Sequence, residues 1–228
     1  MAYVQTRLVT AGEMITGTFD QLALLKREIA IYCGAFLAAG LLVDVFEPLR
    51  SIMGFATFFG YFAAQYWLYR EALSKAGVMV DPRFKVFGFF GMAMILILPI
   101  MFGFNFLVIP GLLLAAKWVM APAFHVAEER DLFSAMGASW RASENNLLAL
   151  FIAFSTLCVI WMVAVGILGA ATSALTGTLG DFGGGTRNAA NAFEWLGFHL
   201  LPIMLMGLSV AAYRALADED TSLVAVFE

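Results

Sequence analysis

Long stretches without a charged residue constrain this chain more than any other feature. Residues 86–116 contain no Asp, Glu, Lys or Arg, and neither do residues 145–180. A helix rises about 1.5 Å per residue, so about 20 apolar residues cross the roughly 30 Å hydrocarbon core of a bilayer. Both stretches are longer than one crossing requires. The chain is therefore expected to fold in lipid.

The composition excludes the main soluble classes. Hydrophobic residues make up 62% of the 228 residues and charged residues 13%, whereas soluble proteins average roughly 45–50% and about 25%. A soluble fold with this composition would expose large apolar patches, which monomeric soluble proteins avoid. The balance of 13 Lys and Arg against 17 Asp and Glu gives no basic stripe for nucleic acid. No nucleic-acid partner is expected.

The pattern predicts an all-α, polytopic membrane bundle that forms a single domain over residues 1–228. Residues 86–126 are too long for one span, so a reversal is expected near residues 103–105, with Pro110 in the first turn of the next helix. The glycine-rich segment 172–193 is expected to be a flexible loop. About six spans are predicted, at residues 28–46, 51–69, 86–104, 108–126, 147–171 and 195–213.

The basic residues predict the orientation of these spans. With six spans, the termini and the loops after the second and fourth spans share one side, which carries 11 of the Lys and Arg residues against 2 on the other. Lys and Arg are retained on the cytoplasmic side. Both termini are therefore expected in the cytoplasm, and the expected location is a bacterial inner membrane.

Two segments are predicted to be amphipathic helices that lie on the membrane surface. Each precedes a span, the first at residues 4–25 and the second at residues 131–145. Their apolar residues recur at helical spacing: Val4, Leu8, Ile15, Phe19 and Leu22 in the first, and Leu132, Phe133, Met136 and Trp140 in the second.

Motifs of enzymes are missing from the sequence. It contains no GxxxxGK[ST] phosphate loop, HExxH, GxSxG or CxxC. His125 and His199 lie 74 residues apart, and neither has an acidic residue at helical spacing that would favour a metal site. No catalysis, metal or cofactor is expected.

Polar residues within the apolar segments are the candidate site, because such groups cost free energy in lipid unless they are paired. For Gln65 the structural alternative is an interhelical hydrogen bond, and for Asn105 a position in a turn. His199 could titrate or bind a headgroup, or could be a neutral histidine that bonds a backbone carbonyl. Lys117 is expected to reach toward phosphates on the cytoplasmic side. These four residues form the candidate intramembrane polar site.

Residues 106–150 carry a spaced pattern: an aliphatic-Pro-Gly turn, a second proline, an acidic pair and an Ala-xxx-Ser-Trp helix. The matching residues are Ile109, Pro110, Gly111, Pro122, Glu128, Glu129, Ala135, Ser139, Trp140 and Arg141. This pattern resembles the membrane domain of some bacterial glycerophosphodiester phosphodiesterases and of related uncharacterised six-span inner-membrane proteins.

The resemblance implies a membrane domain and no hydrolase. In the enzymes of that group the hydrolase is a separate barrel, and such barrels typically need about 250 residues. Six spans leave no room for one. Pro110 and Gly111 suit a helix start after a tight reversal, while Ser139 and Trp140 suit an interfacial helix with an anchoring ring. These four residues are expected to be structural.

The sequence is compatible with two functions. The first is a non-catalytic membrane protein that organises lipid or serves as an accessory subunit of a membrane complex, with lipids, a membrane-protein partner or a second copy of the chain as partners. The alternative is a small transporter or permease with a polar site between helices interrupted at Pro99, Pro110 and Pro202.

Overall fold

The computed structural model describes residues 8–45, 50–79, 86–106, 108–179 and 185–217, and this part of the chain is all-α. A 3₁₀ turn at Glu144–Asn146 leads into the eighth helix. The helices are α1 (Ala11–Leu24), α2 (Lys26–Val45), α3 (Arg50–Lys75), α4 (Val86–Phe106), α5 (Val108–Trp118), α6 (Ala121–Ala127), α7 (Leu132–Ala142), α8 (Leu147–Leu179) and α9 (Gly185–Leu216).

Four helical segments are long and apolar enough to cross a membrane, and they coincide with the last four predicted spans. Only 11% of Val86–Gly103 is buried inside the protein. Its exposed side chains are apolar and include Phe87, Leu98 and Phe102. So much exposed apolar surface is typical of a helix that is covered by lipid or by another protein. The four segments are Val86–Gly103, Val108–Ala127, Glu144–Ala174 and Leu196–Leu216.

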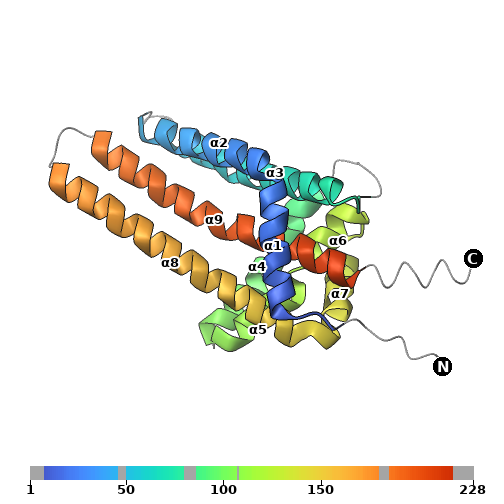
Figure 1. The fold of residues 1–228 in the computed structure, drawn as a ribbon. Helices are drawn as coiled ribbons and strands as arrows, with labels where there is room; N and C mark the ends of the chain where they lie inside the picture. The colour runs from blue at the N-terminus through green and yellow to red at the C-terminus, as the bar shows by residue number, and fades with distance from the viewer. Residues whose placement is uncertain (1–7, 46–49, 80–85, 107, 180–184, 218–228) are drawn as a thin grey trace, which may run out of the picture.

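Of the remaining two predicted spans, residues 28–45 lie within α2 and residues 51–69 within α3, while residue 46 lies outside the described part. The helices α2 and α3 pack against each other and against α9. Figure 1 shows α2, α3, α8 and α9 running lengthwise through the molecule. The ends of α2 and α8 lie at one end, together with the starts of α3 and α9. The opposite end holds α1, α6, α7 and the end of α9 (Figure 1). The first and last described helices therefore meet at the same end of the bundle.

The helix α1 crosses α9 at close range (Figure 1). It begins in a capping box, in which Thr10 Oγ1 accepts from the Glu13 amide and the Glu13 carboxylate accepts from the Thr10 amide. An ideal Cβ on Gly17 would lie 3.3 Å from the Cβ of Ala211, so the two helices nearly touch there. The predicted helix over residues 4–25 is thus observed from residue 11, and residues 4–7 lie outside the described part.

The apolar stripe expected on this first helix does not face the protein uniformly. Met14, Thr18 and Gln21 are the residues of α1 that are buried, whereas Leu8 and Phe19 are exposed. One face of the helix, which carries both polar and apolar residues, therefore packs on α9, while part of the apolar stripe is exposed.

A glycine contact closes the hairpin of α4 and α5. An ideal Cβ on Gly103 would lie 2.9 Å from Gly111 Cα, which is closer than real Cβ atoms approach. The helix α4 continues through Asn105 to Phe106, so the reversal falls later than residues 103–105. Pro110 lies in the first turn of α5, where a missing N–H costs nothing.

The fourth predicted span, residues 108–126, is divided into α5 and α6. Pro122 lies in the first turn of α6. A proline in a continuous helix would clash with the carbonyl four residues earlier, which here belongs to Trp118, the last residue of α5. The proline therefore explains why the helix stops at Trp118 and restarts at Ala121.

Most of the segment expected to be a flexible loop is helical. The helix α8 runs to Leu179 and α9 starts at Gly185, so only residues 180–184 of the segment 172–193 lie outside the described part. The two helices are joined by a hydrogen bond from Trp161 Nε1 to the carbonyl of Gly197, at 2.8 Å. Tertiary packing of this kind overrides the low helix propensity of glycine.

Candidate functional site

Gln65 and His199 lie in one buried hydrogen-bond network, joined by Tyr32. Gln65 Nε2 on α3 donates to Tyr32 Oη on α2 at 2.9 Å, and the same hydroxyl lies 2.9 Å from His199 Nδ1 on α9. A hydroxyl has one donor and two acceptor positions, so Tyr32 Oη can accept from Gln65 and also bond His199 Nδ1. The network therefore ties three helices together.

Aromatic rings surround this network. The Phe36 and Tyr61 rings lie 4.3 and 5.5 Å from the His199 ring, measured between centroids. Tyr32, Gln65 and His199 are all buried. Such a group can hold helices in register. Proton transfer would require a further acid or base, and none of the hydrogen bonds of this network leads to a carboxylate.

Lys117 lies elsewhere, at the contact between α5 and α7. Its ammonium lies 4.9 Å from the Trp140 ring centroid and 3.5 Å from the Trp140 carbonyl oxygen. Ser139 Oγ donates to the carbonyl of Lys117 at 2.8 Å. Three of the residues selected from the sequence, Lys117, Ser139 and Trp140, thus meet in one junction.

Asn105 stands apart from both groups. Its Nδ2 donates to the Met101 carbonyl at 2.9 Å, one turn earlier on its own helix, and its side chain is exposed. Pro110 and Gly111 shape the hairpin of α4 and α5. The four residues of the candidate polar site therefore fall in three separate places. The helices α4 and α9 also run continuously through Pro99 and Pro202.

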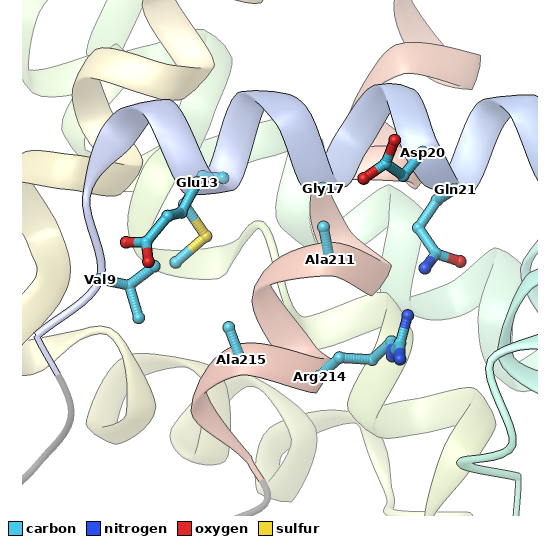
Figure 2. Close-up of a pocket in the computed structure, with 9 residues that line it drawn as sticks. Val9, Glu13, Gly17, Asp20, Gln21, Ala211, Arg214 and Ala215 are labelled. Atoms are coloured by element: carbon cyan, nitrogen blue, oxygen red, sulfur yellow. The ribbon is translucent and has the colours of Figure 1, made fainter.

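A polar hollow of about 280 Å³ lies between α1 and α9. Figure 2 shows Gln21 and Arg214 extending from the two helices into the same space. Only 3% of Gln21 is exposed, and its Oε1 has no hydrogen-bond partner within the described ranges. The lining residues are Val9, Glu13, Met14, Gly17, Asp20, Gln21, Ala211, Arg214 and Ala215.

Sequence reasoning misses this hollow because its charged residues resemble ordinary solvated ones. Asp20 belongs to an amphipathic helix and Arg214 follows the last span. Their proximity depends on how α1 crosses α9, which no local pattern encodes. Gln21 is the one clue in the sequence, as a polar residue next to Leu22 and at helical spacing from Thr18 and Leu25.

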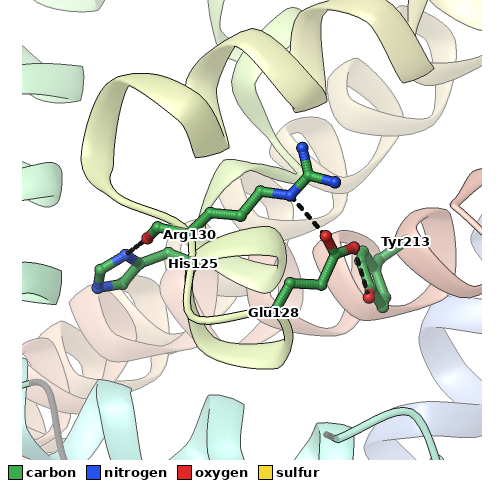
Figure 3. A network of polar contacts seen from close by, with 4 residues as sticks. All are labelled: His125, Glu128, Arg130 and Tyr213. Atoms are coloured by element: carbon green, nitrogen blue, oxygen red, sulfur yellow. Dashed lines mark hydrogen bonds and ion pairs between the residues drawn. The ribbon is translucent and has the colours of Figure 1, made fainter.

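A second polar network joins the segment between α6 and α7 to α9 (Figure 3). Glu128 Oε1 accepts from the Tyr213 hydroxyl at 2.9 Å, and Glu128 Oε2 pairs with Arg130 Nε. His125 Nδ1 donates to the Arg130 carbonyl at 2.7 Å. The acidic position of the family-like motif thus anchors a turn to the end of the last helix.

Replacing Glu128 by glutamine should have a small effect. The amide retains one acceptor and loses the charge that Arg130 pairs with. Both side chains of this pair are partly exposed, with 26% and 30% of their surface accessible, and such pairs contribute about 1 kcal/mol or less. Thermal unfolding in detergent should shift by about 2–4 °C at most. Glu144→Gln, an exposed residue, is the matched control and should leave the transition unchanged.

Ligands for a metal do not come together in the described ranges, where no group of three or more His, Cys, Asp or Glu side chains converges. Cys33 and Cys158 are free thiols on α2 and α8. The arrangement offers hydrogen-bonding and charged surfaces for binding. No family model, curated protein or solved structure matches this chain.

Proposed function

We propose that this chain is a non-catalytic, multi-pass protein of a bacterial inner membrane that organises phospholipid at the cytoplasmic surface. The observation that carries the proposal is Lys117, a largely buried residue whose ammonium lies against the Trp140 ring and has no ion pair among the described residues. In this proposal the similarity of residues 106–150 to the membrane domain of glycerophosphodiester phosphodiesterases reflects a shared lipid environment and no shared reaction.

The proposed topology has six spans, with α2 and α3 added to the four apolar segments. At about 1.5 Å per residue, the 20 residues of α2 and the 26 residues of α3 are long enough to cross a bilayer core. Exposed apolar side chains on α3, such as Phe55 and Phe59, support contact with lipid. The end of the bundle that carries Lys75, Arg130 and Arg214 is assigned to the cytoplasm.

Lys117 supports phosphate binding because its charge is incompletely satisfied. Its exposed fraction is 9%, and among the described residues it makes no ion pair. An ammonium has three donors, and among the described residues the one hydrogen-bond acceptor of Lys117 is the Trp140 carbonyl, at 3.5 Å. A charge on a largely buried residue costs free energy unless a counter-charge lies beside it. A phosphate from a lipid headgroup supplies that counter-charge.

The surface next to Lys117 has the chemistry of a membrane interface. Trp140 and Phe133 on α7 are exposed, and Arg141 follows Trp140 in the same helix. Tryptophan rings are favoured at the headgroup level, and basic residues attract anionic lipid. Together, α7 with Trp140 and Arg141 and α5 with Lys117 therefore present an aromatic anchor and two cations to the same layer of headgroups.

Replacing Lys117 by glutamine should reduce the retention of anionic lipid. A basic residue near an anionic surface contributes about 1 kcal/mol, so the affinity for phosphatidylglycerol should fall about fivefold. The measurement is native mass spectrometry of protein released from nanodiscs of phosphatidylcholine and phosphatidylglycerol. Lys26→Gln removes the same charge from an exposed position on α2 and should change retention far less. Equal retention by Lys117→Gln and the wild type would contradict the proposal.

The transporter alternative has weaker support. The Tyr32, Gln65 and His199 network is the observation in its favour, but aromatic side chains enclose it, and Asn105 and Lys117 lie elsewhere. Flux assays with the purified protein alone in liposomes separate the two functions. Flux of a small solute or ion above that of empty liposomes would overturn the non-catalytic proposal.

A further inference from the structure

The hollow between α1 and α9 has the size and position of a headgroup site. Its volume of about 280 Å³ lies just below the range of drug-sized small-molecule sites, roughly 300–1,000 Å³, and so suits a small headgroup. It lies beside the last turns of α9, at the end of the bundle where α6 and α7 also lie (Figures 1 and 2). That end faces the cytoplasmic headgroups in the proposed topology.

Gln21 is poorly suited to a site that remains empty. Its side chain is buried on the face of α1 that packs on α9, and Oε1 has no donor. Leaving a buried acceptor unpaired is costly, whereas an apolar side chain there would leave nothing unsatisfied. Rotation of the terminal amide exchanges its oxygen and its NH₂ group, so Gln21 can accept from a ligand or donate to one.

The charges on the wall of the hollow have both signs. Arg214 on α9 and Asp20 on α1 are exposed, and in the described part of the chain neither side chain forms an ion pair or a hydrogen bond. Glu13 also lines the hollow, but its Oε2 is engaged by the Thr10 cap. One guanidinium against two carboxylates gives the wall a formal charge of −1.

The charges of Arg214, Asp20 and Glu13 exclude ligands that carry only one sign of charge. A guanidinium favours a phosphate, which it can bind through two parallel hydrogen bonds. A purely anionic headgroup would place its charge beside Asp20 and Glu13, and a simple amine would leave Arg214 without a counter-charge. A ligand with a phosphate and an ammonium matches both walls. Because Asp20 and Gln21 offer hydrogen-bond acceptors, the ammonium should carry N–H donors rather than methyl groups.

We propose that the hollow between α1 and α9 binds a phosphate ester of a primary amine, the headgroup chemistry of phosphatidylethanolamine. Arg214 holds the phosphate, Asp20 holds the ammonium, and Gln21 supplies a hydrogen bond between them. The site rests on the proposed membrane placement for its access to lipid, but it is independent of Lys117. The two sites differ in the lipid they prefer: the site at Lys117 binds anionic lipid, and the hollow binds a zwitterionic headgroup.

The first test compares lipids with the wild-type protein in nanodiscs. The host lipid is phosphatidylcholine, into which phosphatidylethanolamine or phosphatidylglycerol with the same acyl chains is mixed. Phosphatidylethanolamine should be retained more than phosphatidylcholine in native mass spectra and should raise the unfolding temperature, followed with a thiol-reactive dye on Cys33 and Cys158. Equal retention of the ethanolamine and choline lipids would overturn the proposal.

Variants of the wall give a pattern that misfolding cannot imitate. Arg214→Gln should lower the affinity for phosphatidylethanolamine roughly tenfold, the factor expected for one charge-assisted hydrogen-bond pair. Asp20→Asn should also lower that affinity while raising retention of phosphatidylglycerol, because the wall loses a negative charge. Gln21→Leu should lower it without destabilising the protein in pure phosphatidylcholine. Arg27→Gln, an exposed arginine on α2, is the control.

An experiment with a water-soluble ligand distinguishes a lipid headgroup from a free phosphate ester. Phosphoethanolamine, added to the protein in detergent, should raise the unfolding temperature in the wild type and not in Arg214→Gln if the free ester is a ligand. Protection by the lipid alone would assign the site to the membrane. If neither the lipid nor the free ester protects the wild type, the inference is wrong. The proposal that Lys117 binds anionic lipid is tested separately, by the retention of phosphatidylglycerol in Lys117→Gln.

Discussion

Replacing Gly103 by alanine should force α4 and α5 apart and lower the unfolding temperature of the protein in detergent. The new Cβ would lie 2.9 Å from Gly111 Cα and 3.0 Å from Gly111 N. Both atoms belong to the backbone, so no side chain can rotate to make room. Overpacking of this kind typically costs 1–3 kcal/mol, which for a chain of this size corresponds to about 2–12 °C.

The matched control is Gly91→Ala on the same helix. An ideal Cβ on Gly91 meets no atom within 4 Å. Alanine is favoured over glycine in a helix by about 1 kcal/mol, so this variant should be as stable as the wild type or more stable. Dye labelling of Cys33 and Cys158 during heating reports both transitions. Equal unfolding temperatures for the two variants would show that α4 and α5 do not meet at Gly103.

The sequence predicts the apolar helices well because hydrophobicity is a local property. A run such as residues 86–103 must be surrounded by lipid or protein whatever its neighbours are, and α4 is observed there. Helix ends are less predictable. The helices α8 and α9 extend into the glycine-rich segment because they pack on each other, and the break before Ala121 depends on the single ring of Pro122.

The sites depend on contacts between residues far apart in the chain, so only parts of them could be predicted. Gln65 and His199 are conspicuous because amides and imidazoles are rare in apolar runs. Tyr32, which joins them, is not conspicuous, since tyrosine is common near membrane interfaces. Asp20 and Arg214 come from opposite ends of the sequence, and their shared hollow exists only because α1 crosses α9.

Tyr32→Phe should destabilise the protein more than any other loss of a single hydroxyl group in the bundle core. The change removes one oxygen and leaves both Gln65 Nε2 and His199 Nδ1 without their observed partner. An unpaired buried polar group costs about 1–3 kcal/mol. Interhelical hydrogen bonds in membranes average only about 0.6 kcal/mol, because unfolded helices in lipid find other partners. Two groups lose their partner, but the other partners available in lipid offset part of the cost. We therefore expect the free energy of unfolding to fall by about 1–3 kcal/mol and the unfolding temperature by about 2–12 °C.

Tyr61→Phe provides the control for this prediction. Tyr61 lies in the same aromatic cluster, and its hydroxyl forms no hydrogen bond with the residues that the structure describes. Its removal should change the unfolding temperature by about 2 °C or less, since no partner is stranded. A loss for Tyr61→Phe as large as that for Tyr32→Phe would mean that ring packing, and not the hydrogen bonds, stabilises this region.

The double variant Tyr32→Phe with Gln65→Leu tests the mechanism directly. If stranded polar groups cause the loss, removing the Gln65 amide together with the tyrosine hydroxyl should restore part of the stability, because one of the two orphaned groups is gone. The two substitutions should then combine to less than the sum of their separate effects. A hydrogen-bond network that only holds helices together predicts this non-additive result. If loss of packing volume caused the effect instead, the double variant would be less stable than either single variant.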